Sequence, residues 1–133
     1  MPRFDVEAER INVFPVGDEY LFTHFFDQKD VFNELREYYN ESEYRFEIPR
    51  GDFDEVREFL EEQYFDPVVV EDLKQFSVVK EKYTEYSEIL KNSVANWERR
   101  NHRFFLMKDE LSTKEAVEQG ATKIEDTDFA LGI

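Results

Sequence analysis

The sequence predicts an α+β fold, a two-layer domain in which helices pack on one face of a mixed, mainly antiparallel sheet. Residues 11–26 are rich in Val, Phe and Tyr and enclose a Gly-Asp pair, which is typical of a β-hairpin. Two helix–strand units of similar length follow over residues 28–70. No linker or low-complexity stretch divides the 133 residues. We therefore expect a polar N-terminal arm over residues 1–10 and a single domain over residues 11–133.

The predicted hairpin turns at Gly17 and Asp18, where glycine allows a positive φ. Pro15 has no N–H and therefore restricts the first strand to a short segment or to the edge of the sheet. Asp27 follows the second strand and is predicted to be the N-cap of a helix over residues 28–40, whose apolar residues share one face.

The strand over residues 44–48, where apolar and charged side chains alternate, completes the first helix–strand unit, and the second unit follows it. Asp52 and Glu55 are spaced as a capping box, which predicts the start of a second helix. Pro67 is expected to end the second helix, and residues 68–70 are expected to form a buried strand.

Residues 76–100 fit two interpretations. Residues 76–83 fit a strand, whereas apolar residues recur at helical spacing from Val79 to Trp97. The spacing favours a helix that begins near residue 84, or already at Val79, and ends at Arg100.

The last part of the chain predicts a strand, a helix and an edge strand. Residues 103–108 have the clearest remaining strand pattern. Ser112 opens a capping-box match and predicts a short helix that ends with Gly120 at the C′ position. Ile124 and residues 129–131 are expected to add a last edge strand.

The chain is strongly acidic, with 32 acidic and 17 basic residues and a formal net charge of −15. This charge repels phosphate backbones and anionic membranes over most of the surface. The acidic residues are spread along the chain and form no tail, which favours adaptation to a high-salt cytoplasm. A mimic of nucleic acid, a partner for a basic protein and an ordinary acidic protein are the alternatives. Eight lysines and an excess of Glu over Asp count against the salt adaptation.

Several classes of protein are excluded by composition. The chain has no cysteine, which excludes a disulfide scaffold, a thiolate metal site and a cysteine nucleophile. No apolar run approaches the ~18 residues that span a bilayer, and the N-terminus is charged, so we expect a cytoplasmic protein with no membrane segment. Neither a phosphate-binding glycine loop nor a nucleophile elbow occurs, and no cofactor is expected.

Residues 91–108, the basic segment, carry five of the 17 basic residues and a single acid. Guanidinium groups grip phosphate or carboxylate and aromatic rings stack on bases, so this segment is the candidate binding site for an anion or a partner. Its candidate residues are Trp97, Arg99, Arg100, His102 and Arg103. The alternative is a structural role, because cations near a helix C-terminus complement the helix dipole and pair with surrounding carboxylates.

His24 and His102 are the two histidines of the chain. His24 and Asp27 have the spacing of metal ligands, but one histidine among scattered carboxylates is a weak signal, and no metal site is predicted. A packed or hydrogen-bonded His24 is favoured. A small enzyme whose dispersed site includes His24 or His102 stays open as an alternative.

The aromatic content, with 14 Phe, 7 Tyr and 1 Trp, exceeds what one small core needs. Tyrosine is enriched at subunit interfaces, so we expect an exposed aromatic patch and a homodimer. The surplus is concentrated at Tyr38-Tyr39, Tyr64-Phe65, Tyr83 and Tyr86.

Two stretches carry a resemblance to a known family. Residues 93–111 read SVANWERRNHRFFLMKDEL, and residues 116–129 read AVEQGATKIEDTDF. The sequence resembles a small family of acidic haloarchaeal proteins over most of its length, most densely from Tyr83 onward. The resemblance implies a high-salt cytoplasm, and it carries over no activity, cofactor or site residue.

The favoured function is that of a non-enzymatic acidic protein that acts through protein–protein contacts as a homodimer in high salt. Arg99, Arg100 and Arg103 are its expected contact surface. An anion- or RNA-binding module that uses residues 91–108 is one alternative, and the small enzyme is the other. Because affinity for nucleic acid falls steeply with salt, high salt favours protein contact over RNA.

Overall fold

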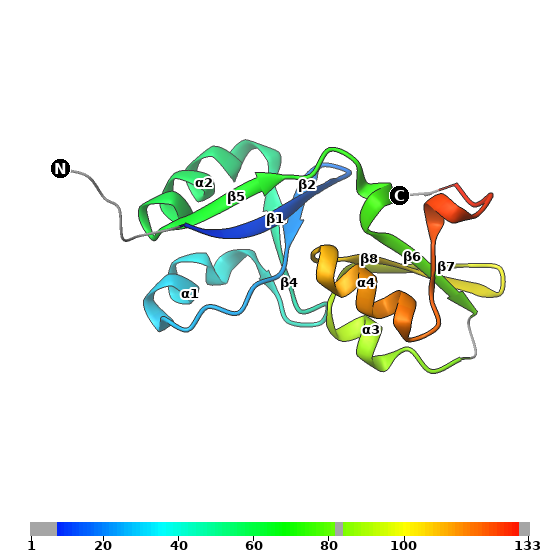
Figure 1. The fold of residues 1–133 in the computed structure, drawn as a ribbon. Helices are drawn as coiled ribbons and strands as arrows, with labels where there is room; N and C mark the ends of the chain where they lie inside the picture. Colours follow the sequence, from blue (N-terminus) through cyan, green and yellow to red (C-terminus); the bar gives the residue numbers. More distant parts are fainter. Residues whose placement is uncertain (1–7, 82–83, 131–133) are drawn as a thin grey trace. The chain divides into compact units, whose positions relative to one another are not determined.

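The computed structural model describes residues 8–81 and 84–130. The chain divides into two compact units, unit 1 (residues 1–70) and unit 2 (residues 71–133), both visible in Figure 1. Helices and mainly antiparallel sheets are both present, which confirms the α+β class. The strands form two sheets, one in each unit, whereas the sequence predicted one sheet. The extent of a single domain over residues 11–133 stays a prediction.

The sheet of unit 1 is mixed. Its strand order is β3-β4-β2-β1-β5, in which β1 and β5 are parallel and all other neighbours are antiparallel. The strands are β1 (Glu9–Val16), β2 (Glu19–Phe22), β3 (Tyr39–Asn40), β4 (Arg45–Pro49) and β5 (Phe65–Val69).

Both α-helices of unit 1 pack against the same face of this sheet. They are α1 (Lys29–Leu35), continued by the 3-10 turn η1 (Arg36–Tyr38), and α2 (Phe53–Glu62), preceded by η2 (Arg50–Asp52). Their buried residues join those of three strands in one core cluster, as a two-layer arrangement requires. The cluster consists of Ile11, Val13, Phe22, Phe26, Val31, Leu35, Phe46, Ile48, Phe53, Val56 and Leu60.

The predicted hairpin is confirmed, and its first strand is longer than expected. Gly17 begins the turn between β1 and β2 with a φ of 60°, a conformation in which a Cβ is strained. Pro15 lies inside the sheet, but β5 pairs with β1 only over residues 9–13, so no ladder bond is lost at Pro15. Glu9 and Arg10 belong to β1, so the predicted arm is wrong for them. Residues 1–7 of that arm lie outside the described residues.

The first helix is shorter than the predicted span of residues 28–40, because the chain enters η1 after Leu35 and β3 at Tyr39. The prediction of Asp27 as its N-cap is wrong. Gln28 holds that position, and its side chain makes no capping hydrogen bond. Pro67 lies within β5, which is tolerated because β5 is at the edge of the sheet.

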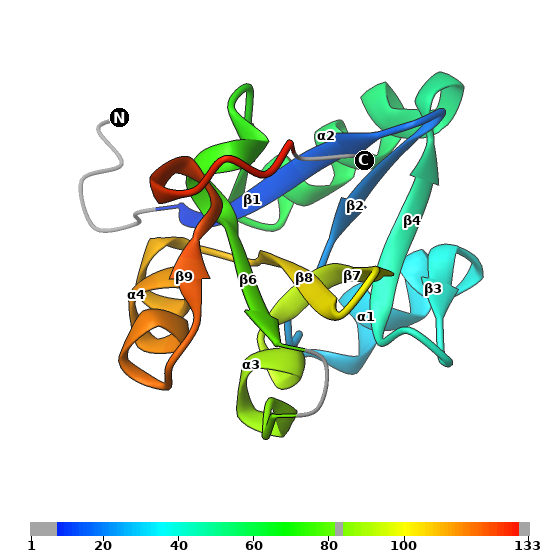
Figure 2. The same cartoon turned by 90° about the vertical axis from the view of Figure 1, so that its right-hand side faces the viewer.

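The sheet of unit 2 is antiparallel, with the strand order β7-β8-β6-β9 (Figure 2). Its strands are β6 (Ser77–Glu81), β7 (Ser93–Arg99), β8 (His102–Met107) and β9 (Thr122–Lys123). Its helices are η3 (Leu73–Phe76), α3 (Ser87–Lys91), α4 (Glu110–Glu118) and η4 (Ile124–Asp126). The strand predicted over residues 103–108 is confirmed, and the strand interpretation of residues 76–83 holds for residues 77–81.

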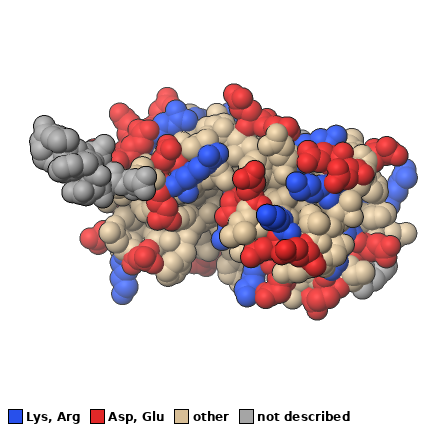
Figure 3. Space-filling model, viewed as in Figure 1, with Lys and Arg blue, Asp and Glu red and all other residues tan. Residues whose placement is uncertain are grey.

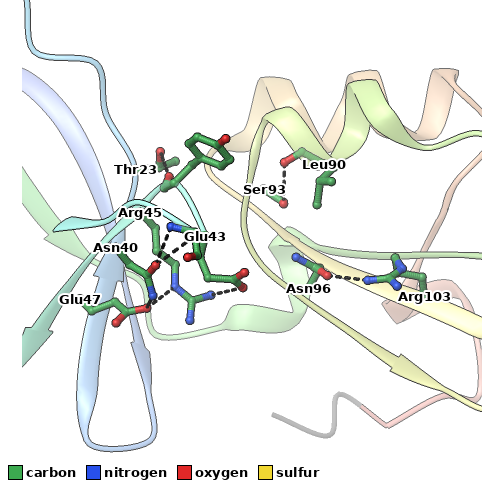
Figure 4. Close-up of polar contacts among 11 residues, drawn as sticks. Thr23, Asn40, Glu43, Arg45, Glu47, Leu90, Ser93, Asn96 and Arg103 are labelled. Atoms are coloured by element: carbon green, nitrogen blue, oxygen red, sulfur yellow. Dashed lines mark hydrogen bonds and ion pairs between the residues drawn. The ribbon is translucent and has the colours of Figure 1, made fainter.

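The prediction of a helix up to Arg100 is wrong. Helix α3 ends at Lys91, where the Ser93 hydroxyl donates to the Leu90 carbonyl at 2.8 Å and satisfies one of the last open acceptors of the helix (Figure 4). Residues 93–99 then form β7. Strand β7 gives the second half of the chain enough strands for a sheet of its own. The structure therefore has two sheets where the sequence predicted one.

Helix α4 begins three residues earlier than the capping-box match indicated. Asp109 is its N-cap, and its Oδ1 accepts from the backbone N–H of Ser112 at 2.7 Å. The predicted end is confirmed, with Gly120 at a φ of 102°. The N–H of Gly120 donates to Val117 at 3.0 Å and that of Ala121 donates to Ala116 at 3.0 Å, the two bonds of a Schellman motif.

The predicted last edge strand is displaced. Residues 122–123 form β9, whereas Ile124 lies in η4 and residues 129–130 lie outside any strand. Residue 131 is outside the described residues. Of the helices in the described part of the chain, none is both long and apolar enough to cross a membrane.

Two clusters cover opposite faces of the unit 2 sheet. On one face, α3 and α4 contribute to the cluster of Val78, Ile89, Phe105, Met107, Ala116 and Ala121. On the other face, η4 and the segment after it cover Val79, Phe104 and Ile124, with Trp97 and Phe129 packed alongside. The β7–β8 hairpin carries residues of both faces.

Candidate functional site

The five candidate residues lie on the β7–β8 hairpin and its turn. The register pairs Trp97 with Phe104 and Arg99 with His102, so Trp97, Arg99 and His102 share one face. Arg103 pairs with Glu98 on the opposite face, and Arg100 lies in the two-residue turn. The structure therefore brings three of the five residues together and separates the other two from them.

On the first face, the aromatic rings pack within unit 2. The Trp97 ring stacks on Phe104 with ring centroids 5.6 Å apart, and the Arg99 guanidinium carbon lies 4.7 Å from the centroid of Phe104. Arg99 Nη2 also donates to the Ala130 carbonyl at 2.7 Å. The His102 ring packs against Phe129 at 4.9 Å. These rings are thus engaged in packing, which leaves little ring face for stacking on bases.

On the second face, Arg103 is held by its neighbours. Its Nη1 donates to Asn96 Oδ1 at 2.6 Å, and its Nη2 forms an ion pair with Glu98 (Figure 4 shows the bond to Asn96). Its guanidinium carbon lies 5.2 Å from the centroid of Tyr86, and only 19% of the side chain is exposed. Glu98 neutralises this charge, so Arg103 is a poor ligand for a further anion.

Arg100 differs from the other arginines of the hairpin. It is exposed, and it makes no hydrogen bond or ion pair with the described residues. Its φ is 59°, in the left-handed region that costs a residue with a Cβ about 1–2 kcal/mol. The hairpin therefore holds a strained arginine at its tip and presents that side chain to solvent.

The alternative explanation of the basic segment, in which its cations complement the dipole of a helix, is wrong for this hairpin. Arg99 and Arg100 end a strand and begin a turn, so no helix C-terminus lies there for them to complement. Pairing with carboxylates accounts for part of the basic segment, because Lys91 pairs with Glu88 at 3.1 Å and Arg103 with Glu98. Neither effect accounts for Arg100.

The two histidines lie in different units. In unit 1, His24 Nε2 is 3.3 Å from Glu9 Oε2, and the ring packs against Phe26 and Phe65. The packed and hydrogen-bonded environment agrees with the interpretation favoured from the sequence. Within the described residues, no group of three His, Asp or Glu side chains is placed to hold a metal ion.

A hollow of about 620 Å³ lies in unit 2 between η3, α4 and the β9–η4 segment. Lys123 and Glu125 in its wall pair at 3.7 Å, and the Thr113 hydroxyl donates to the Asp109 carbonyl at 2.9 Å. Its lining residues are Gln75, Phe76, Glu110, Leu111, Thr113, Lys114, Lys123 and Glu125. Neither histidine lines it, and its walls carry charged side chains of both signs.

Unit 1 exposes two aromatic side chains that no pattern in the sequence indicated as exposed. Phe25 is 83% exposed and Tyr44 is 73% exposed. Of the tyrosines that were singled out, Tyr38 and Tyr39 pack against the core of unit 1, while Tyr64 is 54% exposed. Phe25 follows other aromatic residues in the run FTHFF, where nothing in the sequence distinguishes the exposed ring from the buried ones.

Acidic side chains are spread over the visible face in Figure 3 and are interspersed with Lys and Arg. This distribution agrees with the acidic residues being spread along the sequence. Comparisons of the chain with protein-family models, curated proteins and solved structures give no match.

Proposed function

We propose that this protein acts through protein–protein contact, and that the tip of the β7–β8 hairpin binds an acidic surface on a second copy of the chain. The observation that carries the proposal is Arg100, an exposed arginine in a left-handed turn with no partner among the described residues. Strained residues concentrate at functional sites, where a surrounding structure holds them in place. Arginine is also one of the residue types that dominate binding energy at interfaces.

The chemistry of the tip favours an acidic protein partner. A guanidinium group binds a carboxylate through two parallel hydrogen bonds. A chain of net charge −15 presents many carboxylates, so a second copy is an available acidic partner. We infer a homodimer in a high-salt cytoplasm, where short-range hydrogen bonds persist and the long-range repulsion between the two acidic copies is screened.

The anion- or RNA-binding alternative has less support. Arg99 and Arg103 are engaged within unit 2, and the Trp97 ring is stacked on Phe104. One free arginine neutralises too few phosphates for tight binding of nucleic acid, and molar salt weakens such binding further.

The test is the replacement Arg100→Asn, because asparagine tolerates the left-handed conformation and removes the charge. Analytical ultracentrifugation over a range of protein concentrations is the measurement, in about 0.2 M and in about 2 M KCl, which span the screening range. We expect a dimeric parent, a monomeric Arg100→Asn variant and partial recovery in Arg100→Lys.

Lys29→Asn is the matched control, since Lys29 is an exposed cation of α1 in unit 1 and its loss changes the net charge equally. It is expected to leave the mass unchanged. A parent that is monomeric at every concentration, or an Arg100→Asn variant of parental mass, would refute the proposal. Retention of RNA by the parent and its loss in Arg100→Asn would support the nucleic-acid alternative instead.

A further inference from the structure

Phe25 and Tyr44 are exposed aromatic residues on two loops of unit 1 that lie side by side, and together they are called the aromatic pair. The pairing of β2 with β4, which sets Phe22 opposite Phe46, brings the segment after β2 alongside the loop before β4. The Thr23 hydroxyl donates to the Tyr44 carbonyl at 3.2 Å and joins the two loops. Both residues are more than two-thirds exposed, so their aromatic side chains are accessible to a partner.

The loop that carries Tyr44 is held in one conformation by its own hydrogen bonds. Asn40 Oδ1 accepts from the N–H groups of Ser42 at 2.9 Å and Glu43 at 3.1 Å. Asn40 Nδ2 donates to Glu47 Oε2 at 2.9 Å, as Figure 4 shows. Tyr44 itself has a φ of 56°. The aromatic ring is therefore presented by a strained but well-supported loop, so little conformational entropy is lost when a partner binds it.

Carboxylate residues lie close in the sequence to both members of this aromatic pair. Asp27 follows Phe25 by two residues, and Glu41 and Glu43 lie in the loop that ends with Tyr44. An aromatic face attracts a cation through its quadrupole, and an adjacent carboxylate adds a hydrogen-bonded ion pair. The combination fits a guanidinium group better than an apolar or an anionic partner.

The chain already uses this kind of contact within its units. Arginine guanidinium carbons lie 4.7–5.8 Å from aromatic ring centroids in five described pairs. The arginines are Arg36, Arg50, Arg57, Arg99 and Arg103. Arg100 lies over no ring among the described residues, although it is exposed at the tip of the most basic segment of the chain.

We propose that the aromatic pair Phe25 and Tyr44 is the receptor for the Arg100 hairpin tip of a second copy of this chain, an inference that rests on the proposed function. Charge complementarity selects this occupant, because Arg100 has no partner among the described residues and the receptor loops carry Asp27 and Glu41. Glu43, in the same loop as Glu41, lies 4.0 Å from Arg45 and is engaged within unit 1. Each copy carries both surfaces. Two reciprocal contacts close a dimer, whereas a single head-to-tail contact extends into longer assemblies.

The test uses two variants that damage opposite sides of the contact. Phe25→Ser with Tyr44→Asn removes the receptor, and Arg100→Asn removes the tip. We expect each variant alone to self-associate at least about tenfold more weakly than the parent, the loss that a central hot-spot residue typically causes. Mixed together, the two variants are expected to form a 1:1 heterodimer, because one intact tip then meets one intact receptor.

The matched control is Tyr64→Asn, which removes another exposed tyrosine of unit 1 with a positive φ. It is expected to keep the parental mass, and circular dichroism of every variant checks that the fold is intact. Parental mass in the receptor variant, with a monomeric Arg100→Asn variant, would overturn this inference and leave the proposed function standing. Parental mass in Arg100→Asn would overturn the proposed function itself. A mixture of the two variants that stays monomeric would overturn the pairing of tip and receptor.

Discussion

The hydroxyl of Tyr38 donates a hydrogen bond to Asp52 Oδ2 at 3.0 Å. Asp52 holds the N-cap position of α2, as the capping-box spacing predicted, but its side chain makes no capping bond to that helix. It joins the η1 turn to the start of α2 instead. Burial, followed by the hydrogen bond to Asp52, raises the pKa of Tyr38 to about 12.

We predict that Tyr38→Phe lowers the free energy of unfolding by about 1 kcal/mol, the usual net value of one hydrogen bond. The raised pKa also sets a pH dependence. The stabilising contribution is complete below the ordinary tyrosine pKa of 10.0 and is lost as the pH rises through about 12. Urea denaturation of parent and variant between pH 9 and pH 12, values chosen to span roughly this titration, measures both effects.

The control for this prediction is Tyr64→Phe, because Tyr64 is exposed and its hydroxyl makes no hydrogen bond with the described residues. It is expected to leave the free energy of unfolding near the parental value. The assigned role of the Tyr38–Asp52 bond would be contradicted if Tyr38→Phe and the parent had the same free energy of unfolding at pH 9 and lost it equally as the pH rose.

A second prediction concerns the start of α4. Asp109→Ala removes the carboxylate that accepts from the Ser112 N–H and is expected to cost about 1 kcal/mol of stability. Ser112→Ala is the comparison, because the sequence pattern placed the cap at Ser112 whereas the structure places this residue inside the helix. We expect the Asp109 variant to melt at a lower temperature than the Ser112 variant, and the reverse order would favour the sequence-based start of the helix.

The positions of turns and helix ends could be predicted from the sequence where only one residue type suits the backbone conformation. Gly17 and Gly120 both adopt a positive φ, and each was predicted from this property. The cap residues were less predictable, because Asp27, Asp52 and Asp109 all offer the same carboxylate. Only Asp109 bonds to the N–H of a residue in the helix that follows it. The choice among such carboxylates depends on which competing partner, such as Tyr38, lies within reach.

The prediction of a helix for the candidate residues Trp97 and Arg99 is wrong, because both lie in a strand. Val94 and Trp97 continue a helical spacing from α3, but a short apolar run fits a strand equally well. Pairing with β8 decides for the strand, and this long-range contact leaves no local sequence signal. As a result, residues expected on one helical surface are divided between two faces of a hairpin and its tip. The exposure of Phe25 and Tyr44 likewise depends on tertiary packing.

A third prediction follows from the strain at the hairpin tip. Arg100→Gly is expected to raise the free energy of unfolding by about 0.5–1 kcal/mol, because glycine adopts a positive φ at little cost. Gly17→Ala is the mirror experiment at the β1–β2 turn, where an added Cβ meets no atom within 4 Å. Any loss there is a backbone effect, and we expect about 1 kcal/mol of destabilisation. Denaturant titration at a protein concentration low enough for the parent to be monomeric measures both. A destabilised Arg100→Gly variant under these conditions would show that the arginine stabilises the monomer.

The last prediction concerns the net charge. Thirty-two carboxylates spread over a small chain repel one another, and the Debye length falls from about 10 Å at 0.1 M salt to about 3 Å at 1 M. If the chain is adapted to high salt, its free energy of unfolding rises steadily from low to molar KCl.

Salts differ in how strongly they are excluded from a protein surface, whereas screening depends on ionic strength alone. Below about 0.5 M, KCl and KBr at matched ionic strength are therefore expected to stabilise the fold equally, because screening dominates. A stability that does not change with KCl would contradict the high-salt assignment. In a low-salt cytoplasm the dimer would have to form against the weakly screened repulsion between two chains of charge −15. The dissociation constant of that dimer would therefore fall as salt is added.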